Sequence, residues 1–143
     1  MKRNKLARRG AQRGMTLVEI MIVIAIIGLV MGAVVVAAVP ALEKARCKTA
    51  WQETQSIGQA VAMYQTENNG DCPKSIDELV SAKLLPKAPA DPWGKPFAMK
   101  CPGDKNTDQA DIWSSGKNKQ EGDDDDVKGW LKMDEACKVG GGK

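Results

Sequence analysis

Residues 13–39 of this chain read RGMTLVEIMIVIAIIGLVMGAVVVAAV, and this stretch decides the fold. From Ile20 to Val39 it contains no charged and no strongly polar side chain. A helix rises about 1.5 Å per residue, so this run spans roughly 30 Å, the thickness of the hydrocarbon core of a membrane. The apolar region of an ordinary secretory signal is only about 7–15 residues long. We therefore expect a transmembrane helix.

The distribution of charge predicts the orientation of that helix. Residues 1–14 carry six basic side chains and no acidic one, whereas residues 15–143 carry 15 basic and 18 acidic side chains. Lys and Arg remain on the cytoplasmic side of a membrane, so the basic end should be cytoplasmic. A chain that is acidic beyond its first 14 residues is not expected to bind nucleic acid. Because His is absent, Ser–His and Cys–His nucleophilic pairs are excluded, and we expect no enzyme.

The helix should continue well beyond the apolar run. Residues 41–67 are rich in Ala, Gln, Glu and Lys, which are good or tolerable helix formers. Pro40 should kink the helix rather than end it, because the apolar periodicity resumes beyond it. The stop signal is Asn68-Asn69-Gly70. One apolar stripe is predicted on the second half of the helix, at Trp51, Thr54, Ile57, Val61 and Tyr64.

A small head should follow the helix. Ser75 and Glu78 have the spacing of a capping box that opens a short helix. Asp91-Pro92-Trp93-Gly94 predicts a tight turn. Two short strands are expected at residues 97–101 and 111–115, followed by a loop at residues 116–126. Trp130, Leu131 and Met133 are expected to dock back on the head.

The N-terminal motif resembles the signature of prepilins and pseudopilins. In that family a membrane aspartyl peptidase cuts after the glycine and methylates the new amino terminus. The resemblance implies that Gly14 is the cleavage site, that Met15 is the methylated residue, and that Glu19 is the fifth residue of the mature chain. Phenylalanine is more common at the position of Met15, although other apolar residues occur there.

Glu19 also has a physical argument of its own. A carboxylate one turn into a membrane helix costs about 2–3 kcal/mol or more unless it is paired. Cleavage creates a partner, the charged amine of Met15, and in a filament the amine of a neighbouring copy can approach Glu19. Such a pair would set the register between subunits. The alternative is a polar residue at the membrane edge of a plain anchor.

The acidic stretch at residues 118–126 allows two interpretations. It is a solvated run of like charges, or it holds a hard cation such as calcium, which accepts six to eight oxygens. The residues around Asp91-Pro92-Trp93-Gly94, with the loop after residue 115, resemble the head of the type II secretion major pseudopilin, which holds a structural calcium. The resemblance implies the Ser115 carbonyl and the side chains of Asn118, Asp125 and Asp126 as ligands, with Asp123 as a further contributor. Asn118 replaces a more frequent aspartate.

Four cysteines, an even number, lie beyond the predicted membrane span, where disulfides persist. They are Cys47, Cys72, Cys101 and Cys137. Three pairings are possible, and free thiols are the alternative. We favour Cys72–Cys101 with Cys47–Cys137. The usual pseudopilin does not rely on such bonds.

Together these features predict an α+β, type IV pilin-like fold in which a long N-terminal helix packs on a small head with short helices, a small antiparallel sheet and a calcium-binding loop. The expected divisions are a leader (1–14), a transmembrane half-helix (15–39), an amphipathic half-helix (40–67) and a globular head (68–143).

The resemblance implies a structural subunit of the type II secretion pseudopilus that drives export of folded proteins. The expected partners are other copies of the chain, minor pseudopilins, the prepilin peptidase, the inner-membrane assembly platform and the outer-membrane secretin. The expected location is the inner membrane of a Gram-negative bacterium, with the head in the periplasm. A type IV pilin for adhesion, motility or DNA uptake is the alternative, for which Cys101–Cys137 would form the usual C-terminal disulfide loop.

Overall fold

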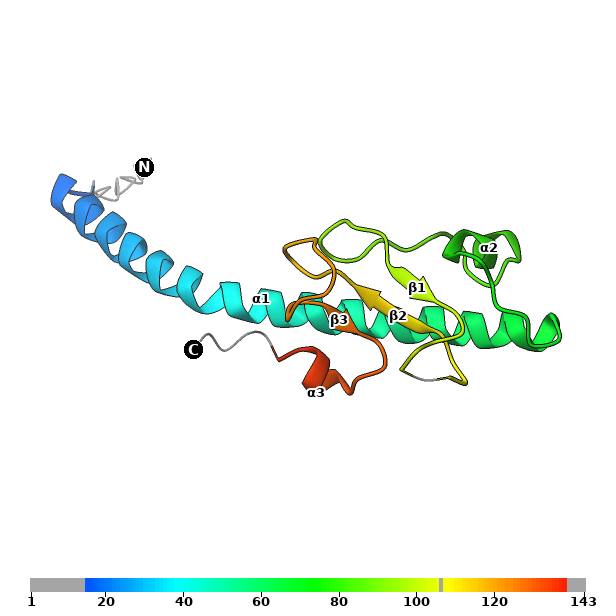
Figure 1. Cartoon of the computed structure of the whole chain (residues 1–143). Helices are drawn as coiled ribbons and strands as arrows, with labels where there is room; N and C mark the ends of the chain where they lie inside the picture. Colours follow the sequence, from blue (N-terminus) through cyan, green and yellow to red (C-terminus); the bar gives the residue numbers. More distant parts are fainter. Residues whose placement is uncertain (1–14, 106, 139–143) are drawn as a thin grey trace, which may run out of the picture. The chain divides into compact units, whose positions relative to one another are not determined.

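A computed structural model describes residues 15–105 and 107–138 of the chain. It divides into two compact units, residues 1–38 and residues 39–143, and helix α1 belongs to both. The leader predicted at residues 1–14 lies outside the described residues. The elements follow the chain in the order α1 (Leu17–Glu67), α2 (Ile76–Ser81), β1 (Ala98–Lys100), β2 (Asp111–Ser114), β3 (Val127–Lys128) and α3 (Met133–Ala136) (Figure 1).

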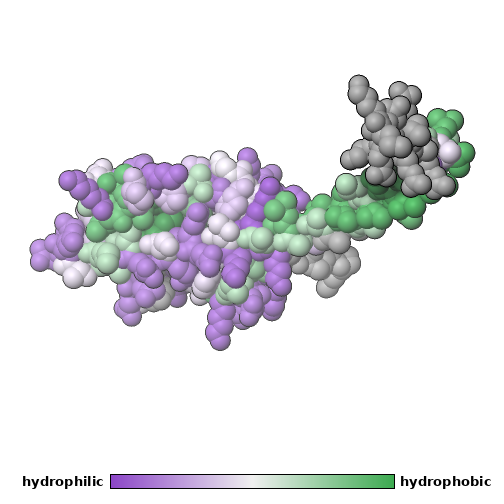
Figure 2. All heavy atoms as spheres, turned by 180° about the vertical axis from the view of Figure 1, so that it is seen from behind, coloured by the Kyte–Doolittle hydropathy of each residue, from purple (hydrophilic) through white to green (hydrophobic). Residues whose placement is uncertain are grey.

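The first unit holds the N-terminal part of α1. Its large apolar side chains are exposed, among them Leu17 (79% exposed) and Leu29 (78%). Figure 2 shows this part of the helix as a mostly hydrophobic surface. Among the described residues, α1 is the one helix long and apolar enough to cross a membrane. The span predicted from the sequence is therefore a helix whose apolar side chains are exposed among the described residues.

The rest of α1 supports the head. The helix continues through Pro40 and ends at Glu67, where Asn69 and Gly70 adopt positive φ angles, as the sequence predicts. The Gly70 amide donates to the Gln65 carbonyl at 2.7 Å, which closes the helix end. The predicted stripe is confirmed, because Thr54, Ile57 and Val61 are buried and Trp51 and Tyr64 are partly buried against the core.

A three-stranded antiparallel sheet in the order β1-β2-β3 packs against α1. The two predicted strands are present but shorter than expected, and β3 and α3 were not predicted. Ile112 on β2 points inward, and a Cβ added at Gly58 of the helix would lie 3.7 Å from its Cδ1. Gly129 lies so close to Thr54 that an added Cβ would be 2.8 Å from the Thr54 hydroxyl. The core is thus a thin layer between α1 and the small sheet, to which Leu79 of α2 also contributes.

Two local predictions have different outcomes. The turn at residues 91–94 is confirmed, because the Gly94 amide donates to the Asp91 carbonyl at 2.9 Å. The capping box at α2 is wrong in its first half, because Ser75 is the N-cap but its side chain makes no capping bond. Glu78 instead accepts from the Lys74 amide at 2.6 Å and from the Tyr64 hydroxyl at 2.9 Å.

Two disulfides, Cys47–Cys137 and Cys72–Cys101, complete the head. These are the two pairings that the sequence analysis favoured. Among the described residues no cysteine is free. The Cys101–Cys137 loop expected of a type IV pilin is therefore absent from the described head.

Candidate functional site

The N-terminal motif is built by the start of helix α1. The Thr16 amide and hydroxyl both donate to Glu19 Oε2, at 2.8 and 3.0 Å, and the Glu19 amide donates to the Thr16 hydroxyl at 3.2 Å. This is a reciprocal capping box, in which each side chain satisfies an amide that the helix leaves free. Met15 is 75% exposed beside it. Gly14, the predicted cleavage position, lies outside the described residues.

The capping box changes the account of Glu19. Thr16 was not among the predicted partners of this carboxylate, which were all charged, although the spacing of Thr16 and Glu19 is the ordinary signature of a capping box. Both Thr16 donors contact the same oxygen, Oε2. The two bonds reduce the cost of placing the carboxylate in lipid but leave its negative charge in place.

The acidic loop connects β2 to β3, and its start is fixed by backbone geometry. Gly116 has φ of +64°, and an added Cβ would lie 2.2 Å from the Asp125 carbonyl oxygen. The two ends of the loop are therefore in backbone contact at Gly116, where only glycine fits. Ser115, whose carbonyl was the predicted ligand, is buried at this point.

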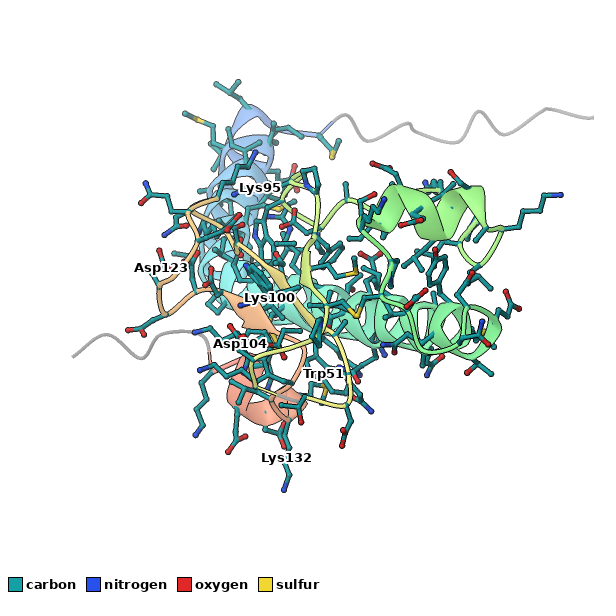
Figure 3. All side chains as sticks on the ribbon, turned by 45° about the vertical axis from the view of Figure 1, so that its right-hand side comes forward. Trp51, Lys95, Lys100, Asp104, Asp123 and Lys132 are labelled. Atoms are coloured by element: carbon teal, nitrogen blue, oxygen red, sulfur yellow. A yellow bond between two sulfur atoms is a disulfide. The ribbon has the colours of Figure 1, made fainter. Side chains whose placement is uncertain are left out.

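Three of the predicted side chains come together in this loop (Figure 3 labels Asp123). The Asn118 amide donates to Asp125 Oδ2 at 3.0 Å, and the Asn118 side-chain amide donates to Asp123 Oδ2. The Asp125 amide donates to Asp123 Oδ1 at 3.2 Å. Hydrogen bonds from Asp125 and Asn118 lower the pKa of Asp123, whereas burial and then the hydrogen bond to Asp123 raise the pKa of Asp125. Asn118, Asp123 and Asp125 thus form one hydrogen-bonded cluster in the loop.

Asp126 makes different contacts from Asp123 and Asp125. Its Oδ2 accepts from the Gly122 amide at 2.8 Å, and its Oδ1 is buried without a hydrogen-bond partner. An unpaired buried carboxylate oxygen is costly and is a place where a cation would be stabilising. In residues 15–105 and 107–138, however, no three acidic or sulfur side chains are placed closely enough to hold a metal as they stand.

The basic residues around the loop serve to position it. Lys95 Nζ donates to the Ser115 hydroxyl at 2.9 Å and to the Lys119 carbonyl at 3.1 Å, and forms an ion pair with Glu121 at 3.4 Å. Sequence reasoning missed this role of Lys95, which is far from the loop in sequence. The turn at residues 91–94 explains it, because that turn directs Lys95 toward the loop.

Asp91 of the turn is itself a structural residue. It is 4% exposed, its Oδ1 accepts from the amides of Trp93 and Lys95 at 3.1 and 2.8 Å, and its Oδ2 accepts from the Ser114 hydroxyl at 2.5 Å. One carboxylate thus ties the turn to β2 immediately before the acidic loop. The turn, Lys95 and the loop form one connected unit.

Comparison with known proteins agrees with this arrangement. The family model for the type II secretion system (T2SS), protein G, matches residues 37–130, which include the turn, the sheet and the acidic loop. The chain belongs to the type II secretion protein G family. A second model, the prokaryotic N-terminal methylation motif, matches residues 9–35. The chain is therefore a structural pseudopilin and not an enzyme, and it is membrane-anchored and located in the cell envelope.

Several curated relatives align with most of the chain. Type II secretion system core protein G of Escherichia coli (strain K12) is 32% identical over 134 residues, covering 83% of this chain and 91% of the relative. The protein of the same name from Aeromonas hydrophila is 31% identical, with 83% and 92% coverage. The one from Klebsiella michiganensis is 30% identical, with 86% and 96% coverage.

Proposed function

We propose that this chain is the major subunit of a type II secretion pseudopilus and that it assembles only after its leader is removed. The observation that carries this proposal is the N-terminal part of α1, whose exposed apolar side chains require lipid before assembly and other copies of the helix after it. The proposed leader is residues 1–14, the membrane segment residues 15–39, the amphipathic segment residues 40–67 and the head residues 68–143.

Processing of the amino terminus is the first proposed step. A prepilin peptidase cuts between Gly14 and Met15 on the cytoplasmic face of the inner membrane and methylates Met15. The match to the N-terminal methylation motif supports this step. Cleavage leaves a positively charged amine one turn before Glu19, in a segment that otherwise has no basic side chain as far as Lys44.

Assembly follows from the charge that cleavage creates. In the filament, the Met15 amine of one copy pairs with the Glu19 carboxylate of a neighbour, which fixes the register of the two helices. The Thr16 bonds orient Glu19 through Oε2 and do not use Oε1. The heads lie in the periplasm. Growth from an inner-membrane platform, with minor pseudopilins, drives folded proteins through an outer-membrane secretin.

The mass of the amino terminus tests the processing step. The chain is expressed with and without a prepilin peptidase, and the expected result is loss of residues 1–14 together with one added methyl group only when the peptidase is present. An uncleaved chain in an assembling cell would refute the proposal. Deletion of the gene should abolish export of folded proteins; loss of surface fibres with secretion intact would instead indicate a type IV pilin.

We also propose that the acidic loop holds a structural calcium ion. The hydrogen-bonded cluster of Asn118, Asp123 and Asp125 and the unpartnered Asp126 Oδ1 support it, because a divalent cation would offset the repulsion between the carboxylates. The candidate ligands are the Ser115 carbonyl and the side chains of Asn118, Asp123, Asp125 and Asp126. Closing the site requires a small rearrangement of these side chains around the ion.

Thermal melting tests the calcium proposal. Calcium should raise the melting temperature of the chain by several degrees relative to a chelator, because the ion binds only the folded loop. Asp126→Asn keeps an acceptor for the Gly122 amide but removes a charge, and should lose most of that increase. Asp134→Asn, on an exposed residue of α3, is the matched control. A melting temperature that is the same with calcium and with a chelator would show that the loop is a solvated acidic run.

A further inference from the structure

The C-terminal segment of the head lies beyond the residues that the family model matches. We call residues 131–138 the strap; they follow the matched range of 37–130 directly and contain helix α3. The strap has little structure that could hold it in place by itself. Helix α3 is four residues long, has no buried residue and has no side-chain cap at Lys132. A helix of one turn is not stable alone in water.

Attachment to helix α1 comes from one face of that helix. Cys47, Trp51 and Gln55 recur at four-residue spacing and therefore lie on the same side. Cys47 forms the disulfide with Cys137, and Trp51 Nε1 donates to the Leu131 carbonyl at 2.9 Å. Gln55 Nε2 donates to the Gly129 carbonyl at 2.7 Å, just before the strap. Leu131 is paired with Trp51 and Cys137 with Cys47, so the strap runs in the opposite direction to α1. Figure 3 labels Trp51 on α1 and Lys132 on the strap.

Of these three attachments, only the disulfide is covalent. The two hydrogen bonds can be exchanged for bonds to water at small net cost, whereas the disulfide closes a loop between residues 90 positions apart in the sequence. Cys47 is also part of the buried core, at 6% exposure. The position of the strap therefore depends on whether this one sulfur–sulfur bond has formed.

The strap in turn forms a wall beside the acidic loop. A cavity of about 160 Å³ is lined both by residues of the strap and its disulfide and by residues of the acidic loop, namely Cys47, Ala136, Cys137, Lys138, Asp124 and Asp125. A second cavity, of about 330 Å³, is also lined by Ala136, Lys138 and Asp124. Lys138 thus places a positive charge beside a loop that carries four consecutive aspartates.

We propose that oxidation of Cys47 and Cys137 is a maturation step that closes the strap and thereby orders the acidic loop. The oxidant is a reactive protein disulfide of the cell envelope. The two thiols lose two electrons and two protons and form the Cys47–Cys137 bond, while the disulfide of the oxidant is reduced to two thiols. This inference rests on the proposed position of the head outside the cytoplasm. The Cys72–Cys101 bond, at the far end of α1, has no part in it.

Amide hydrogen exchange on the full chain in detergent micelles tests the proposal. In the parent chain the amides at positions 136 and 137 donate to the carbonyls of Lys132 and Met133, and in C47A/C137A these two amides should exchange at least tenfold faster. The acidic-loop amides of Asn118 and Gly122 should exchange several-fold faster. The matched control, C72A/C101A, removes the other disulfide and should leave both regions within twofold of the parent.

A second measurement keeps the Cys47 and Cys137 side chains in place. In C72A/C101A the only remaining disulfide is Cys47–Cys137, so a phosphine reductant opens that bond alone. Exchange of the strap and the acidic loop should rise on reduction and return to its starting rate when oxidised glutathione removes two hydrogen atoms from the chain. Unchanged exchange of the strap or the loop on reduction would overturn the proposal. The readout needs neither leader cleavage nor a filament, so it fails or succeeds separately from the proposed assembly.

Discussion

At the scale of single residues, buried carboxylates explain most of the specific geometry of the head. Asp91 accepts three hydrogen bonds, and Glu53 shows the opposite case. Glu53 Oε2 is buried without a partner, and burial, followed by the nearby charge of Asp91, raises its pKa. Asp91 therefore stabilises the turn through its hydrogen bonds, whereas the buried oxygen of Glu53 is destabilising.

Glu53 predicts a pH dependence of stability. Because its pKa is higher in the folded chain than in the unfolded chain, the folded chain binds more protons, and the free energy of unfolding falls as the pH rises above about 4.5. Glu53→Gln should therefore be more stable than the parent at pH 7 and about equally stable at pH 4. Urea unfolding midpoints at the two pH values measure this, with the exposed Glu67→Gln as control. A stability difference that does not change with pH would contradict the assignment.

Asp91 predicts a loss of stability. Asp91→Ala leaves the amides of Trp93 and Lys95 and the Ser114 hydroxyl without their acceptor, and should lower the free energy of unfolding by about 3 kcal/mol. Asp91→Asn retains one side-chain acceptor and should cost roughly half as much. Chemical unfolding of both variants gives the comparison. Equal losses would mean that the charge of Asp91, and not its geometry, supports the turn.

At the scale of elements, the sequence predicted correctly those features that depend on neighbouring residues in the chain. The end of α1 at Asn69 and Gly70 and the turn at residues 91–94 depend on neighbouring residues, and both were predicted. Strand β3 has only two residues, and it forms by pairing with β2 across the acidic loop. Its own sequence therefore does not predict it. The Ser75 cap failed because Glu78 bonds to Lys74 and Tyr64 instead, and the contact with Tyr64 is tertiary.

In the candidate site, too, residues close together in the sequence were predicted and a residue from a distant element was not. The Asn118, Asp123 and Asp125 cluster lies within eight residues, so its members were found from spacing and resemblance. Lys95 is absent from that prediction because it reaches the loop through space, from another element. The capping partner Thr16 had a local signal, which the sequence analysis overlooked because it considered charge alone.

The acidic loop predicts a contrast between two glycines. Gly116→Ala would place a Cβ 2.2 Å from the Asp125 carbonyl oxygen, so the loop must open, at a cost of about 3 kcal/mol. Gly122→Ala meets nothing within 4 Å and carries only the penalty of its positive φ, about 1 kcal/mol. Urea unfolding of the two variants measures the difference. Similar losses would show that the loop ends are not in close contact.

At the scale of the whole molecule, the two units have different requirements. The head has its own core and disulfides, whereas the apolar side chains in the N-terminal part of α1 are exposed among the residues that the structure describes. The apolar surface of such a chain is removed from water only in lipid or in a polymer. Glu19 is the charged residue within this apolar part of the helix. Thr16 donates hydrogen bonds to it in the single chain, and in the filament it is proposed to bind the amine of another copy.

Two substitutions separate these roles of Glu19. Thr16→Ala removes the hydroxyl of the capping box but keeps the carboxylate, so it should cost about 1 kcal/mol of helix stability and leave filament yield within a few-fold of the parent. Glu19→Ala removes the charge that pairs with the Met15 amine of the neighbour, and it should abolish filaments while leaving leader cleavage and membrane insertion intact. Filaments sheared from cells and quantified by immunoblotting give the yield, and the amino-terminal mass verifies processing. If both variants assembled equally well, Glu19 would be a helix cap only, and the register of the filament would have to come from the apolar packing of α1 alone.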